Sequence, residues 1–141
     1  MKKIKEDHIT SELKQLATPW IVALERAVRI KKIGLGEGLI LDLACGSGIQ
    51  LAAYSSELNR ACIGVEINQK RASIAKNTLK NILNKEIYNN SKIIQGNCLK
   101  IDELNIKKNI EFSLIHLDPA RPTNIQSHII SEMEPSPIEA I

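Results

Sequence analysis

The sequence has 141 residues, of which 43% are hydrophobic and 25% charged, and these shares are typical of a folded soluble domain. They exclude a disordered chain and a collagen-like repeat, and no apolar run is long enough to span a membrane. The net charge of +3 is too small an excess to identify a partner. Because aromatic residues make up only 3%, the core must consist mainly of Ile, Leu, Val and Ala, which suits packed layers of strands and helices.

The amino terminus and the cysteines predict a cytoplasmic protein. Residues 1–5 are basic, but Glu, Asp and His follow at positions 6–8, where a signal peptide requires an apolar stretch. The three cysteines, Cys45, Cys62 and Cys98, lie far apart and have no metal-ligand spacing. We therefore expect reduced thiols, no metal site and no association with a membrane.

The first elements are predicted to be helices. Ile9, Leu13 and Leu16 recur at helical spacing, which indicates a short first helix. A second helix is expected from Pro19 to about Lys32, since proline is favoured in the first turn and basic residues in the last. Gly34 is its natural stop.

A strand, a turn and a helix are expected next. After the glycine-rich loop at residues 34–38, the nearly continuous apolar run 39–43 is typical of a buried strand. Residues 44–48, Ala-Cys-Gly-Ser-Gly, form a strand-to-helix turn, and a helix is expected from Ile49 to about Leu58.

The remaining elements repeat this alternation. A second strand is expected at residues 61–66, and the helix after it presents one apolar face made of Ala72, Ala75, Leu79 and Ile82. Residues 92–95 are a weaker third strand and residues 111–117 a fourth, which ends before Pro119 because proline cannot extend the ladder.

Strands that alternate with helices across long connections predict an α/β fold, a doubly wound parallel sheet with helices on both faces. We expect a single domain, in which residues 1–35 form an N-terminal helical segment and residues 36–141 form the sheet and its helices.

The turn from Asp42 to Gly48 is the strongest candidate for a binding site. Its glycines allow a ligand to approach the backbone, and the helix that follows offers free amide groups. Glu66 ends the next strand, where a carboxylate is suited to accept hydrogen bonds from both ribose hydroxyls of a nucleoside.

Two other nucleotide sites fit less well. A dinucleotide fingerprint that starts at Gly46 needs a small residue at position 51, which is Leu51, so binding of NAD is weakened. A P-loop fails because no Gly-Lys-Ser/Thr follows the turn.

Four segments, taken in order, resemble motifs of the class I S-adenosylmethionine-dependent methyltransferases: residues 39–48, 63–67, 94–98 and 114–121. The resemblance implies a Rossmann-like fold, S-adenosylmethionine as cofactor and methyl transfer as the reaction. It also implies a set of cofactor-binding residues: Asp42, Ala44, Gly46, Ser47, Gly48, Glu66, Ile67, Asn97 and Cys98.

The resemblance gives these residues separate roles. Asp42 would lie near the amino group of the methionine moiety and Glu66 would hold the ribose. Ile67 would cover one face of the adenine. Asn97 replaces the family's frequent aspartate and would pair with the adenine edge through its carbonyl. Cys98 would contribute a backbone amide.

The fourth motif bears on the substrate. Asp118-Pro119-Ala120-Arg121 lacks the aromatic residue of enzymes that methylate exocyclic amines of bases and is similar to the form seen in RNA methyltransferases. RNA is therefore the expected substrate, with Asp118 and Pro119 as the catalytic candidates. His116, Cys45 and Trp20 are expected to be packing residues.

The resembled fold continues with further strands, whereas this sequence ends about 20 residues after its fourth strand. Two explanations fit this difference in length. The sequence is a natural short form or a fragment, or a second copy or partner chain covers the edge of the fourth strand. The alternative functions are a cofactor-binding module without catalysis and an NAD-dependent oxidoreductase.

Overall fold

The computed structural model describes residues 18–118 and confirms the predicted fold class. Four strands form one sheet in the order β3-β2-β1-β4, and every neighbouring pair is parallel. The elements, in chain order, are α2 (Trp20–Ile33), β1 (Leu39–Asp42), α3 (Ile49–Leu58), β2 (Cys62–Glu66), α4 (Gln69–Ile82), α5 (Lys85–Asn89), β3 (Lys92–Gln95), the 3-10 helix η2 (Cys98–Glu103) and β4 (Phe112–His116).

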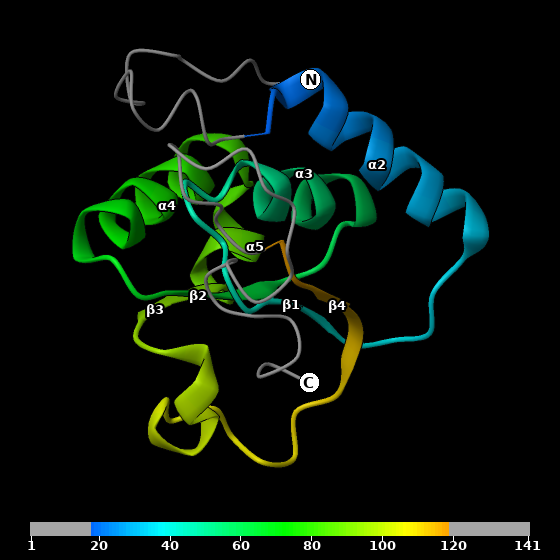
Figure 1. Cartoon of the computed structure of the whole chain (residues 1–141). Helices are drawn as coiled ribbons and strands as arrows, with labels where there is room; N and C mark the ends of the chain where they lie inside the picture. The colour runs from blue at the N-terminus through cyan, green and yellow to red at the C-terminus, as the bar shows by residue number, and fades with distance from the viewer. Residues whose placement is uncertain (1–17, 119–141) are drawn as a thin grey trace, which may run out of the picture.

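The helices are layered on the sheet (Figure 1). Helices α2, α3 and α4 cover one face, and η2 lies on the opposite side. Right-handed crossovers explain this division. From β1 to β3 each new strand is added on the same side of the preceding one, whereas β4 is added on the far side of β1, so the connection from β3 to β4 crosses the opposite face of the sheet. Helices were expected on both faces. Within residues 18–118 the second face carries the 3-10 helix in place of an α-helix.

The core lies between the sheet and α3. Every residue from Ile49 to Ser55 is buried, so α3 is covered on all sides over its first two turns. Ala23 and Ala27, both fully buried, let α2 approach α3 closely. Trp20 packs against this core, as the sequence predicted.

Two short elements, α5 and η2, were not predicted from the sequence. Asn84 caps α5 by accepting the amide of Ile87 at 2.8 Å, just as Asn68 caps α4 through the amide of Arg71 at 3.0 Å. The first predicted helix, with Ile9, lies outside the described residues. No helix within residues 18–118 is both long enough and apolar enough to cross a membrane.

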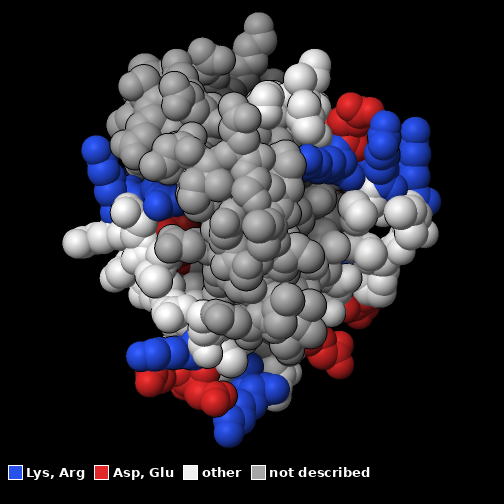
Figure 2. All heavy atoms as spheres, viewed as in Figure 1, with Lys and Arg blue, Asp and Glu red and all other residues white. Residues whose placement is uncertain are grey.

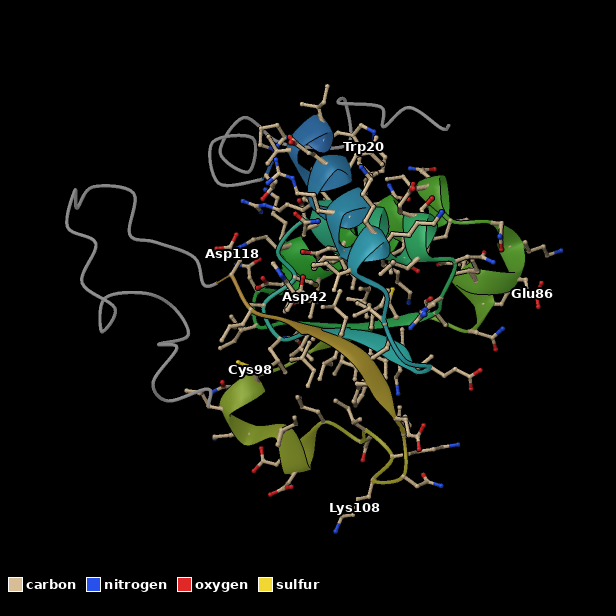
Figure 3. The ribbon with its side chains drawn as sticks, turned by 90° about the vertical axis from the view of Figure 1, so that its right-hand side faces the viewer. Trp20, Asp42, Glu86, Cys98, Lys108 and Asp118 are labelled. Carbon is tan, nitrogen blue, oxygen red and sulfur yellow. The ribbon has the colours of Figure 1, made fainter. Side chains whose placement is uncertain are left out.

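Because all strands are parallel, their carboxyl ends meet at one edge of the sheet. Figure 3 shows Asp42 and Asp118 on this carboxyl edge and Lys108 at the opposite end of β4. The main chain joins the two strands here, since the amide of Leu43 donates to the carbonyl of His116 at 3.1 Å. The acidic residues of the sequence motifs are thus gathered at one edge.

Candidate functional site

Glu66 is a buried carboxylate held in place by the backbone. Its Oε1 accepts the amide of Gly46 at 3.1 Å, and its Oε2 accepts the amide of Asn68 at 2.7 Å. The side chain is only 5% exposed. Each carboxylate oxygen keeps a second lone pair, so two further donors can be accepted from one fixed direction.

The glycine turn is shaped by positive backbone angles. Gly46 has φ 55° and Gly48 has φ 82°, conformations that side chains disfavour. A Cβ added at Gly48 would lie 3.1 Å from the backbone of Ala75, so glycine lets α3 and α4 approach each other. At Gly46 an added Cβ would meet no atom within 4 Å. Among the described residues, the space beside the Gly46 Cα is therefore open, and the Gly46 amide is bound to the Glu66 carboxylate.

Position 51 shows how α3 packs against β2. Leu51 is fully buried, and a Cβ on Gly64 would lie 2.7 Å from its side chain. A dinucleotide fingerprint has its small residue on the helix, whereas here the glycine is on the strand and the helix residue is large. This arrangement agrees with the weak match of the NAD pattern.

Asp42 ends β1 beneath the turn and is 2% exposed. Its Oδ1 accepts the amide of Ala44 at 3.1 Å. Burial raises its pKa from 3.8 to about 7, the Ala44 amide lowers it in part, and the negative charges of Asp118 and Glu66 raise it further. Asp42 therefore changes charge close to neutral pH.

The end of β4 lies beside Asp42. His116 pairs with Asp42 in the parallel register, and the carboxylate of Asp118 acts electrostatically on Asp42. The ring of His116 meets that of Tyr54 edge-on, with centroids 5.4 Å apart. Burial lowers the pKa of His116, which Asp118 partly offsets. The ring contact with Tyr54 agrees with the predicted packing role of His116.

A second group of residues follows β3. The amide of Gly96 donates to the carbonyl of Glu66 at 2.9 Å, which places Asn97 and Cys98 beside the end of β2. Asn97 Oδ1 accepts the amide of Leu99 at 3.0 Å and so caps η2, which uses one lone pair of the oxygen that was expected to pair with adenine. Ile67, 60% exposed, leaves an apolar side chain open to solvent next to Glu66.

The predicted cofactor-binding residues lie on three neighbouring connections at the carboxyl edge. Asp42 ends β1, and the connection to α3 that follows carries Ala44, Gly46, Ser47 and Gly48. Glu66 ends β2 and Ile67 follows it, while Asn97 and Cys98 follow β3. Asp118 follows β4. Pro119 lies outside the described residues, as does Arg121.

Two residues near this edge, Arg26 and Gln50, were missed from the sequence. Arg26 Nη1 donates to Gln50 Oε1 at 3.2 Å, and Gln50 Nε2 donates to the carbonyl of Ala23 at 3.0 Å. The charge of Arg26 also lowers the pKa of Tyr54 and of His116. The alanines at positions 23 and 27 were the available signal, because small residues at i and i+4 permit close helix packing.

The chemistry of the described residues favours binding over nucleophilic attack. Burial raises the pKa of Cys45 and of Cys62, which makes both thiols poor nucleophiles. Cys45 is only 8% exposed, in agreement with its predicted packing role. Within residues 18–118 no cluster of His, Cys, Asp or Glu is arranged to hold a metal ion. What the site offers is a pair of buried carboxylates, an open glycine turn and an exposed apolar side chain.

No family model matches the sequence, and no curated protein matches it significantly. Solved structures do match the fold. A protein from Porphyromonas gingivalis W83 provisionally assigned as a methyltransferase superposes with a TM-score of 0.63 at 19% identity, over 90% of this chain and 29% of that one. A protein provisionally assigned as an RNA methyltransferase, PH1948 from Pyrococcus horikoshii, superposes with a TM-score of 0.54 at 17% identity, over 79% of this chain and 51% of that one.

The glycopeptide N-methyltransferase MtfA in complex with sinefungin superposes with a TM-score of 0.50 at 17% identity, over 72% of this chain and 36% of that one. At these identities the matches show that the chain has the fold of class I methyltransferases. The chain spans about half of PH1948 and less than a third of the Porphyromonas protein.

Proposed function

We propose that this chain binds S-adenosylmethionine at the carboxyl edge of its sheet and takes part in methyl transfer to RNA. The observation that carries the proposal is the Glu66 carboxylate, fixed by two backbone amides beside the open space at Gly46. Methyltransferases with the same fold support the choice of cofactor.

The described residues fit the parts of this cofactor. Glu66 would accept both ribose hydroxyls through its remaining lone pairs. Asp42, once ionised, would attract the ammonium group of the methionine moiety. Ile67 and Leu99, which are 60% and 42% exposed, would cover the adenine, with the Cys98 amide and Asn97 at its edge. Each part of the cofactor would thus meet a group of matching chemistry.

Bound S-adenosylmethionine supplies an electrophilic methyl group on a sulfonium. The protein's contribution is to align the acceptor with that methyl group, and alignment alone accounts for a large share of the rate in such reactions. Asp118 is exposed at the end of β4 and close enough to Asp42 to influence its charge. We assign to it the role of orienting the acceptor or removing its proton, with Pro119 beside it in the sequence.

RNA is proposed as the acceptor on two grounds. The sequence from Asp118 to Arg121 resembles the fourth motif of RNA methyltransferases, and PH1948 is provisionally assigned as an RNA methyltransferase. β4 is an edge of the sheet within residues 18–118, and Ile115 is 60% exposed on it. A second copy or a partner chain that pairs with this edge belongs to the same proposal.

The alternative is a module that binds the cofactor without turnover, and methyl incorporation separates the two. With S-adenosylmethionine labelled in its methyl group, we expect label in RNA with the unmodified chain. Asp118→Ala should lower the rate about 100-fold, the usual size of a lost general base, and leave S-adenosylhomocysteine binding unchanged. Cofactor binding without incorporation into any RNA would favour the binding module.

A further inference from the structure

The exposed face of α4 is basic and has no acidic counterpart. The helix contains Lys70, Arg71, Lys76 and Lys80 and no Asp or Glu. Its buried stripe, which includes Ala72, Ala75 and Leu79, faces the sheet, so Lys70, Lys76 and Lys80 are exposed on the opposite side. These three lysines define the α4 lysine face. Figure 2 shows basic side chains gathered over α4 at the left of the molecule.

Some of the other basic residues of the described surface pair with acids or lie close to them in the sequence. Arg29 pairs with Glu25 at 2.7 Å on α2, and Lys31 lies 3.7 Å from Glu57. The connection from η2 to β4 carries Lys107 and Lys108 close in sequence to acidic residues at 102, 103 and 111. Within residues 18–118, no lysine of the α4 face has an ion-pair partner. Helix α4 carries four basic residues and no acid, whereas α2 carries four basic residues and Glu25.

This charge pattern weakens the helix that carries it. Lys70 and Arg71 lie in the first turn, at the positive end of the helix dipole, where basic residues are unfavourable. Lys76 and Lys80 are four residues apart, and like charges at this spacing repel each other on a helix surface. A pattern that opposes helix stability fits a surface whose charges are neutralised by an anionic partner.

We propose that the α4 lysine face binds the phosphate backbone of RNA. This proposal rests on the proposed RNA substrate and adds where the strand lies. Helix α4 begins at the carboxyl edge directly after Glu66, and Lys70 and Lys80 are about 15 Å apart along it. The face is thus long enough to contact several successive phosphates, and its first turn adjoins the candidate cofactor site. Contacts of this kind hold a strand in position and do not read its bases.

The test compares two double variants of the full chain. Lys76→Gln/Lys80→Gln removes two charges of the α4 lysine face, and Lys107→Gln/Lys108→Gln removes two exposed charges at the far end of β4 (Figure 3). Binding of a short fluorescein-labelled single-stranded RNA is followed by anisotropy over a salt series. S-adenosylhomocysteine binding and thermal unfolding are measured on the same samples.

We expect the α4 variant to bind RNA about tenfold more weakly at low salt. The slope of the logarithm of its RNA affinity against the logarithm of the salt concentration should become shallower by about 1.4, since each phosphate contact to a single strand contributes about 0.7. The control variant should match the unmodified chain, and all three should bind S-adenosylhomocysteine equally. The α4 variant should unfold at nearly the same temperature as the unmodified chain, because the repulsion that is removed offsets the loss of Lys80 from the last turn of the helix.

Equal RNA binding by the two variants would overturn the assignment to α4 and leave the proposed function standing. Binding to vesicles of phosphatidylcholine and phosphatidylserine, with no binding to RNA, would overturn it in favour of a membrane surface. Absence of both RNA and S-adenosylhomocysteine binding by the folded, unmodified chain would overturn the proposed function itself.

Discussion

Asp42→Asn is expected to stabilise the fold at about pH 8 and to remove most of the cofactor affinity. Burial raises the pKa of Asp42 to about 7, so the folded chain binds a proton at this site more tightly than the unfolded chain does. Below about pH 4 both states are protonated, and the carboxyl costs no stability. As the pH rises from about 4 to 7 the unfolded state ionises first and stability falls.

The neutral asparagine avoids this cost. At about pH 8 the variant should therefore gain on the order of 2–4 kcal/mol in free energy of unfolding, and the gain should vanish near pH 4. Denaturant titrations at both pH values measure it. Asp102→Asn, on the exposed η2 helix, is the control and should change stability by less than about 0.5 kcal/mol.

The same substitution removes the charge that attracts the cofactor's ammonium group. S-adenosylhomocysteine affinity of the unmodified chain should rise between about pH 6 and pH 8, as Asp42 ionises, and the variant should lose this dependence. Equal stability of the variant and the unmodified chain at about pH 8 would mean that Asp42 is not buried as an acid of raised pKa.

Gly38→Ala is expected to destabilise the fold by about 3 kcal/mol or more. Gly38 has φ 138°, and an added Cβ would lie 2.8 Å from both the carbonyl oxygen of Glu111 and the amide nitrogen of Ser113. Both contacts are with backbone, which cannot rotate away. The Ser113 hydroxyl also donates to the Gly38 carbonyl at 2.8 Å, so the substitution separates the starts of β1 and β4.

Gly36→Ala is the matched control for this effect. It lies in the same loop, and an added Cβ would meet no atom within 4 Å. Stability should stay within about 0.5 kcal/mol, or increase slightly because the unfolded chain loses freedom. Thermal unfolding of the pair gives the comparison. Similar losses in both variants would show that the loop tolerates no side chain anywhere, contrary to the contacts at Gly38.

These glycines illustrate what the sequence could predict. The alternation of apolar runs with helical stripes was enough for the parallel sheet, because local periodicity reports directly which residues are buried. The segment from Gly34 to Gly38 was predicted only as a glycine-rich loop. The close contact at Gly38 depends on a strand that is more than 70 positions away in the sequence, and no local pattern reports it.

The candidate site also has a part that the sequence predicts and a part that it does not. Asp42 and Glu66 were predicted because each ends a strand, and Gly46 because it lies in the glycine turn that follows; parallel strands bring their carboxyl ends together. The two amide hydrogen bonds that fix Glu66 were not predicted, since they depend on how the turn folds back over β2. Arg26 was missed because its position follows from helix packing.

Calorimetric titration with S-adenosylhomocysteine tests the central claim most directly, with Glu66→Gln as the variant and NAD as the competing ligand. Glutamine keeps one acceptor oxygen, but its NH2 group faces a backbone amide, of Gly46 or Asn68, that also donates. That amide loses its hydrogen bond and one acceptor for the ribose is lost, so affinity for S-adenosylhomocysteine should fall about 10- to 100-fold. We predict micromolar binding of S-adenosylhomocysteine by the unmodified chain, about −8 kcal/mol, and no binding of NAD. Binding of NAD, or S-adenosylhomocysteine binding that Glu66→Gln leaves unchanged, would contradict the account.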